Sequence, residues 1–66
     1  MAVVKVIEIM AESEKSWEDA ANVALKAAAK SVKNIKAIYI ADMQAIVEND
    51  EIVRYRVNAK LSFVVE

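Results

Sequence analysis

Apolar, mostly β-branched residues fill residues 3–10, VVKVIEIM, and occur on both faces of an extended chain. This composition predicts a β-strand. The polar run that follows, AESEKS, interrupts the apolar pattern and suits the start of a helix. Either Ser13 or Ser16 caps this helix, and Asp19 stands in the reciprocal position of a capping box if Ser16 is the cap.

Residues 16–32, SWEDAANVALKAAAKSV, carry apolar side chains at spacings of three and four, with charged and amide side chains on the remaining arc. The pattern predicts an amphipathic helix of about seventeen residues. Acidic residues occupy its first turns and lysines its last, which is the order that the helix dipole favours. Because its apolar face is mostly alanine, we expect the helix to lie close to whatever it covers.

Two further apolar runs, roughly residues 35–48 and 51–65, are separated by Asn49 and Asp50, a pair that tolerates the positive φ of a two-residue hairpin turn. In the second run, an apolar face from Val53 to Val65 alternates with a polar one. In the first run, strict alternation places Ala37, Tyr39, Ala41, Met43, Ala45 and Val47 on one face and Ile38, Ile40, Asp42, Gln44, Ile46 and Glu48 on the other.

The predicted order is strand, helix, strand, strand, in a single α+β domain over residues 1–66. A strand of about fourteen residues extends over ~45 Å, whereas a helix of about seventeen residues spans only ~26 Å. One helix cannot cover such a hairpin. The uncovered apolar surface and open strand edges therefore predict association with other copies of the chain.

The amino-acid composition limits the kinds of catalytic and binding site that this chain can form. The 66 residues contain no cysteine, histidine, glycine or proline. Disulfides, zinc clusters, histidine acid–base catalysis and glycine-rich phosphate loops are therefore excluded. Glu8, Glu12 and Asp42 have no evident nucleophile or desolvated partner beside them, so we expect a binding protein and not an enzyme.

Net charge and hydropathy bear on the partners of the protein and on its location in the cell. The formal net charge of −1 favours neither nucleic acid nor an anionic membrane as a partner. The hydrophobic fraction of 58% exceeds the ~45–50% usual for a soluble domain, which again favours burial between copies. No apolar stretch approaches the ~20 residues of a membrane span, and the N-terminal run does not resemble a signal peptide. We expect a cytoplasmic protein.

The segments MAVVKVIEIM, SWEDAANVAL, KSVKNIKAI and YRVNAKLSFVVE, in this order and spacing, closely resemble the dodecins over essentially the whole chain. The resemblance implies a βαββ subunit whose three-stranded antiparallel sheet, with strand order 1-3-2, wraps around its helix. It also implies assembly into a hollow homododecamer built from four trimers.

The resemblance further implies a ligand site. In flavin-binding dodecins a tryptophan early in the second strand stacks on the flavin, and a glutamine in the third strand hydrogen-bonds to it. These positions fall on Ala37 and Arg56 here. Alanine offers no stacking surface, and an arginine donates hydrogen bonds but accepts none. By this resemblance Ala37, Met43, Gln44 and Arg56 line a site for a flavin (FMN, riboflavin or FAD) or a similar phosphate-bearing cofactor.

An alternative is a flavin-free shell. The YR pair together with the missing tryptophan resembles dodecin relatives of which one branch binds calcium, an ion that takes six to eight oxygen ligands. The acidic residues show no EF-hand spacing, so such a site would be assembled between subunits. They are Glu12, Glu14, Glu18, Asp19, Asp42, Glu48, Asp50 and Glu51. The shell could equally bind other ions or be purely structural.

Two further groups of side chains have open roles. Arg54, Arg56 and Lys60 share one strand face. They either pair with Asp42, Gln44 or Glu48 across the hairpin or with another subunit, or they attract anionic ligands such as flavin or coenzyme A phosphates. For Trp17 we expect packing against the sheet or a neighbouring helix. We expect the two tyrosines, residues 39 and 55, to be cross-strand packing residues whose hydroxyls reach solvent or an interface.

Overall fold

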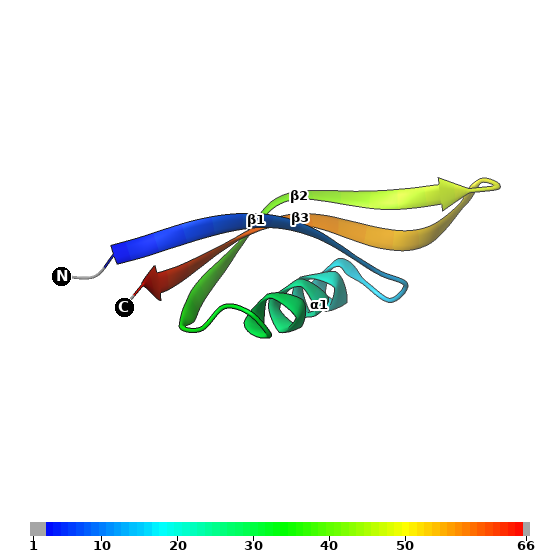
Figure 1. Ribbon diagram of the computed structural model, residues 1–66. Coiled ribbons are helices and arrows are strands. Elements are labelled where there is room, and N and C mark those ends of the chain that lie inside the picture. The colour runs from blue at the N-terminus through cyan, green and yellow to red at the C-terminus, as the bar shows by residue number, and fades with distance from the viewer. Residues whose placement is uncertain (1–2, 66) are drawn as a thin grey trace.

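Strand, helix, strand and strand follow one another as the sequence predicts (Figure 1). The protein is described by a computed structural model over residues 3–65. Its elements are β1 (Val3–Ser13), α1 (Trp17–Ala29), β2 (Ile35–Glu48) and β3 (Glu51–Val65). Within these residues no helix is long and apolar enough to cross a membrane.

The three strands form one antiparallel sheet in the order β1-β3-β2, which confirms the predicted topology. The central strand β3 pairs with β1 from Val3↔Val65 to Ser13↔Tyr55. The tight turn between β2 and β3 has φ values of 52° at Asn49 and 62° at Asp50, as expected for the two-residue hairpin. Both β1 and β2 are left as open edges of this chain's sheet.

Ser16, one of the two predicted caps, is the N-cap of α1. The hydroxyl of Ser16 accepts a hydrogen bond from the Asp19 backbone N–H at 2.9 Å. The buried Ser13 also contributes, because its hydroxyl donates to Asp19 Oδ2 at 2.6 Å. The end of β1 and the first turn of α1 are thus held together by one short network.

The helix is shorter than the sequence pattern predicts. It ends at Ala29, and the backbone N–H groups of Ser31 and Val32 both bond to the Ala28 carbonyl. Asn34 then adopts a φ of 63°. The expected end near residue 32 is therefore wrong, because the chain turns there to enter β2.

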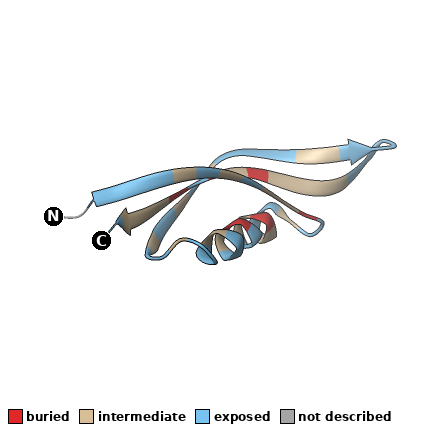
Figure 2. Cartoon of the chain, viewed as in Figure 1, coloured by how far each residue is buried: buried red, intermediate tan, exposed pale blue. Residues whose placement is uncertain are grey.

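The core lies between α1 and the middle of β3 (Figure 2). It consists of five fully buried apolar residues, Ala20, Ala24, Val57, Ala59 and Leu61. Both buried helix residues are alanines, which allows the close approach that the composition predicted. We call the sheet surface that faces α1 the helix face and the opposite surface the outer face.

The sheet extends far past the helix. The chain is 51 Å long, whereas a helix of 13 residues spans only about 20 Å. The hairpin end of β2 and β3 runs beyond α1 (Figure 1). Among residues 3–65 eleven large hydrophobic side chains are exposed, of which nine lie on the strands and two, Trp17 and Val23, on α1. The mismatch inferred from the sequence is present, and it is larger than expected because the helix is shorter.

One expectation about β2 is wrong. The register against β3 shifts at three places, including between Ile40 and Asp42, so Ala41 is an extra residue in a β-bulge. An extra residue exchanges the two faces of a strand. Tyr39 therefore lies on the outer face, whereas Met43 pairs with Val57 on the helix face. Strict alternation fails because the bulge depends on pairing with β3.

Candidate functional site

A network of charged side chains lies on the outer face near the hairpin half of the sheet. Glu12 of β1 and Gln44 of β2 flank Arg56 of β3 in register. Arg56 Nε donates to Glu12 Oε2 at 2.7 Å, and Arg56 Nη1 lies 3.5 Å from Gln44 Oε1. Arg54 adds ion pairs to Glu12 at 3.2 Å and to Glu48 at 3.6 Å.

The arginines hold Glu12 in its ionised form. The hydrogen bond from Arg56 lowers the pKa of Glu12 below its ordinary value of 4.5. Desolvation opposes this shift, and the positive charges of Arg56 and Arg54 each add a smaller lowering. Arg54 Nε lies at ion-pair distance from Glu12 without a hydrogen bond, so that contact is electrostatic. A carboxylate held ionised in this way does not suit a general acid.

Two of the three predicted cations form ion pairs within the chain. Arg54 and Arg56 pair with Glu12 and Glu48, so two positive charges meet two negative ones. Pairing across the hairpin was one of the two predicted alternatives. Glu12 was missed as the main partner, because its position opposite Arg56 depends on the register of β1 and on that strand continuing to Ser13.

A hollow of about 270 Å³ lies elsewhere on the outer face. Its lining comes from all three strands and comprises Val6, Ala37, Tyr39, Lys60 and Ser62. The short side chain of Ala37 stands between longer neighbours and leaves this space. Tyr39 is 65% exposed, so within this chain it is not the packed residue that the sequence predicts.

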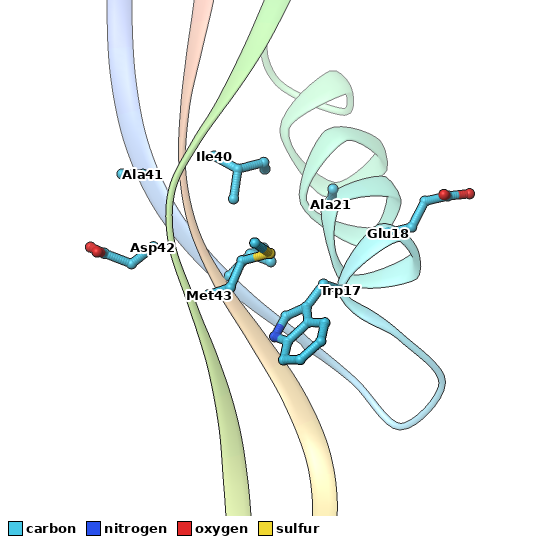
Figure 3. Close-up of a pocket in the computed structure, with 8 residues that line it drawn as sticks. Trp17, Glu18, Ala21, Ile40, Ala41, Asp42 and Met43 are labelled. Carbon is cyan, nitrogen blue, oxygen red and sulfur yellow. The ribbon is translucent and has the colours of Figure 1, made fainter.

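A second hollow, of about 370 Å³, lies between α1 and β2. Trp17 and Met43 lie at its centre, with Ile40 and Ala21 behind them, while the carboxylates of Glu18 and Asp42 point away from it (Figure 3). It is therefore an apolar surface without a charged group directed into it.

Trp17 packs against the sheet, as predicted. Its ring lies edge-on to Tyr55, with 5.0 Å between ring centroids and 74° between planes. Its indole Nε1 donates to the Gln44 backbone carbonyl at 2.9 Å. These contacts connect α1 to β2 and β3, so the indole of Trp17 has a structural role.

The structure brings together only part of the predicted ligand site. Gln44 and Arg56 are in contact on the outer face. Ala37 lies on the same face, in the hollow beside Tyr39. It pairs with Ser62 and so lies farther from the hairpin turn than Gln44, which pairs with Arg56. Met43 lies on the helix face. That any of the four binds a ligand stays a prediction.

The two flavin contacts that the resemblance implies are not reproduced by the residues at those positions. Ala37 presents a methyl group, and Arg56 has its guanidinium bound to Glu12 and Gln44. The hollow around Ala37 nevertheless offers an exposed aromatic ring and an amine. Its chemistry suits a planar ligand with an anionic group, bound through different residues.

A calcium ion finds no complete set of ligands in one chain. Among residues 3–65 no three acidic side chains converge in a group that could hold a metal ion. Ca²⁺ takes six to eight oxygen ligands.

Comparison with known proteins agrees with this fold. The dodecin family model matches residues 3–66. The calcium dodecin of Mycobacterium tuberculosis is 35% identical over 63 residues, which cover 96% of this chain and 89% of that protein. Its crystal structure, that of a calcium-chelating antigen with a calcium-binding site, aligns at 33% identity with a TM-score of 0.85, covering 97% and 91% of the two chains.

Other solved dodecins share the fold at lower identity. A Thermus thermophilus dodecin variant matches with a TM-score of 0.94 at 23% identity, covering 100% of this chain and 98% of that one. The Streptomyces coelicolor dodecin matches with a TM-score of 0.94 at 18% identity, covering 98% and 93%. A small α+β subunit with one helix on a long, half-bare sheet is the subunit of a small-ligand-binding family. This chain belongs to the dodecin family.

Proposed function

We propose that the protein is a homododecameric, cytoplasmic container that binds and stores a flavin or a similar phosphate-bearing cofactor between its subunits. It acts by occlusion and not by turnover, because packed subunits shield the ligand from solvent. The observation that carries the proposal is the bare outer face, which combines apolar residues, the neutral ion-pair network and the hollow at Ala37.

Assembly is supported by the amount of apolar surface that one chain leaves exposed. Its core contains only five fully buried apolar residues, whereas eleven large hydrophobic side chains are exposed. So many exposed apolar side chains on a small subunit favour association, and the open edges β1 and β2 would otherwise be prone to aggregation. Closure into a symmetric shell removes both problems at once.

The proposal is tested by two measurements on the purified protein. Light scattering after size exclusion should give a mass near twelve times the chain mass of 7.3 kDa. Titration of FMN should quench its fluorescence with micromolar affinity, and a yellow colour on purification would give the same result directly. A monomer would contradict the container, and unchanged flavin emission on an intact dodecamer would contradict the cofactor.

Calcium storage is the second candidate, favoured by one observation. The similar Mycobacterium tuberculosis protein is named a calcium dodecin and is 35% identical. For this chain the ion would be held by carboxylates of neighbouring subunits. A rise in melting temperature with Ca²⁺, absent with Mg²⁺ at equal concentration, together with no flavin quenching, would favour this function over the first.

A further inference from the structure

We propose that the tip of the β2–β3 hairpin of one copy docks against the turn between α1 and β2 of a second copy, with carboxylates of the tip facing lysines of the turn. The hairpin tip comprises residues 47–52, and we call residues 30–36 the lysine turn. This inference rests on the proposed assembly and assigns one of its contacts to two definite surfaces.

The lysine turn belongs to a stretch of unbalanced positive charge. Between Asp19 and Asp42 the chain contains no carboxylate and four lysines, residues 26, 30, 33 and 36. All four are exposed, and none takes part in an ion pair within residues 3–65. Lys26 and Lys30 lie at the end of α1, where the helix dipole favours cations. Lys33 and Lys36 lie beyond the helix, so the dipole does not account for them.

Strand pairing brings no neutralising carboxylate to this turn. The Asn34 carbonyl accepts a hydrogen bond from the Val64 N–H, and Ile35 pairs with Phe63, whose partner on β1 is another cation, Lys5. From Val3 to Ile9, β1 contains one carboxylate, Glu8, and this stands opposite Lys60. The positive charge of the lysine turn is therefore open to a partner.

An apolar hollow of about 240 Å³ adjoins the lysine turn. It is lined by Leu25 of α1 and by residues 35–38 of β2, among which Lys36 is the charged residue. The register shift between residues 35 and 37 leaves Lys36 as an extra residue in β2, without a partner on β3. A hollow with apolar walls and cations beside it suits an apolar group that carries carboxylates.

The hairpin tip has this complementary composition. Val47 and Ile52 pair across the two strands and are 60% and 56% exposed. Exposed carboxylates follow directly, at residues 48, 50 and 51. Among residues 3–65 only the first of these forms an ion pair, from Glu48 to Arg54. The tip extends past α1 (Figure 1), so no element of its own chain covers it.

The two surfaces lie toward opposite ends of a chain 51 Å long, so a tip meets the lysine turn of another copy and not its own. Such a contact joins unlike surfaces and is heterologous, which generates a closed ring when the rotation between copies fits. Exposed ion pairs contribute little free energy. Burial of Val47 and Ile52 would therefore supply most of the stability, whereas the charges select the orientation of the copies.

The test is a charge swap on the full chain. Light scattering, in the urea concentration that half-dissociates the wild-type assembly, gives the chain concentration needed for half assembly. Glu51→Lys and Lys36→Glu should each raise that concentration by about tenfold or more, because an attraction becomes a repulsion. The variant that combines both changes should return to within about threefold of wild type, since the charges are again opposite.

Matched controls carry the same charge changes away from both surfaces. Glu14→Lys and Lys15→Glu are exposed, lie between β1 and α1, and should stay within about threefold of wild type. The difference between each single swap and wild type should also shrink in about 1 M salt, where the Debye length is ~3 Å. Circular dichroism shows whether each variant keeps its helix and sheet.

Each outcome separates this contact from the wider proposal. If the combined variant assembles no better than the single swaps, or if the single swaps behave as their controls do, the tip does not meet the lysine turn, and the container function stands. If a single swap fails to fold, recovery of assembly in the combined variant still supports the contact, and its absence contradicts it. A wild-type protein that is monomeric without urea would overturn both the assembly and the contact.

Discussion

Arg56 Nε donates a hydrogen bond to Glu12 Oε2 at 2.7 Å, although 44 residues separate the two in the chain. Arg56 stands where a flavin-binding relative would have a glutamine, by the resemblance drawn from the sequence. Its guanidinium is engaged by a carboxylate from β1 and by the Gln44 amide. The outer face is thus stabilised by the chain itself at this point, before any ligand arrives.

The Glu12→Gln variant tests this network. Its melting temperature should fall below that of wild type near neutral pH, because two arginines lose their anionic partner. The loss should be larger at low salt, since the pairs are partly exposed. Glu14→Gln removes the same charge from an exposed position outside the network and should have a smaller effect. An equal loss in both variants would show that only net charge matters.

The same pair predicts a pH dependence. The pKa of Glu12 is lowered in the folded state from 4.5, so the unfolded state binds the proton more tightly. The stabilisation by Glu12 is therefore complete above the unfolded value and is lost as pH falls through the lower, folded value. The difference in melting temperature between wild type and Glu12→Gln should be constant above about pH 5.5 and shrink toward zero in acid. A difference that grows in acid would contradict the sign.

The hairpin turn predicts a second set of variants. Asn49 and Asp50 both adopt positive φ, a region that costs most residues about 1–2 kcal/mol and glycine almost nothing. Asp50→Ala should therefore lower the free energy of unfolding by about 1 kcal/mol, whereas Asp50→Gly should equal or exceed wild type. Urea denaturation at matched protein concentration measures both. Glu51→Ala, beside the turn in extended backbone, controls for loss of charge.

The contact between helix and sheet predicts intolerance of larger residues. Ala24 is 1% exposed and lies on the side of α1 that packs against the sheet. Ala24→Leu should destabilise the subunit by about 1–3 kcal/mol, because added methylenes force the helix away from the sheet. Ala27 is exposed on the same helix, so Ala27→Leu should be close to neutral. Equal destabilisation by the two variants would mean that Ala27 is covered in the assembly.

The helix cap predicts a smaller effect. Ser16→Ala removes the acceptor for the Asp19 N–H and should cost about 0.5–2 kcal/mol, measured by thermal unfolding. Ser16→Asp keeps an acceptor and should retain most of the stability. Ser31→Ala, in the exposed turn after the helix, serves as the control and should be near neutral. A cost as large for Ser31→Ala would show that the loss is not specific to the cap.

Local pattern was sufficient for most of the fold. The bounds of β2 and β3 and the turn at Asn49 and Asp50 follow from residues that are neighbours in the chain, and so does the choice of Ser13 or Ser16 as the helix cap, of which the structure shows Ser16. Turn chemistry and capping act over a few residues, so short-range patterns specify them. The excess of apolar surface over what a 13-residue helix can cover also follows from composition and length.

Only the tertiary structure decided which side chains meet. The bulge at Ala41 puts Met43 on the helix face, opposite to Ala37 and Tyr39, against the alternation expected for β2. The register of β1 against β3 places Glu12 on Arg56, and that of β2 against β3 places Tyr39 beside Lys60. These choices depend on pairing between strands distant in the chain, where a shift of one residue exchanges the faces. The sequence by itself therefore determined the elements and the excess of apolar surface over what the helix can cover, whereas strand register determined the chemistry of the outer face.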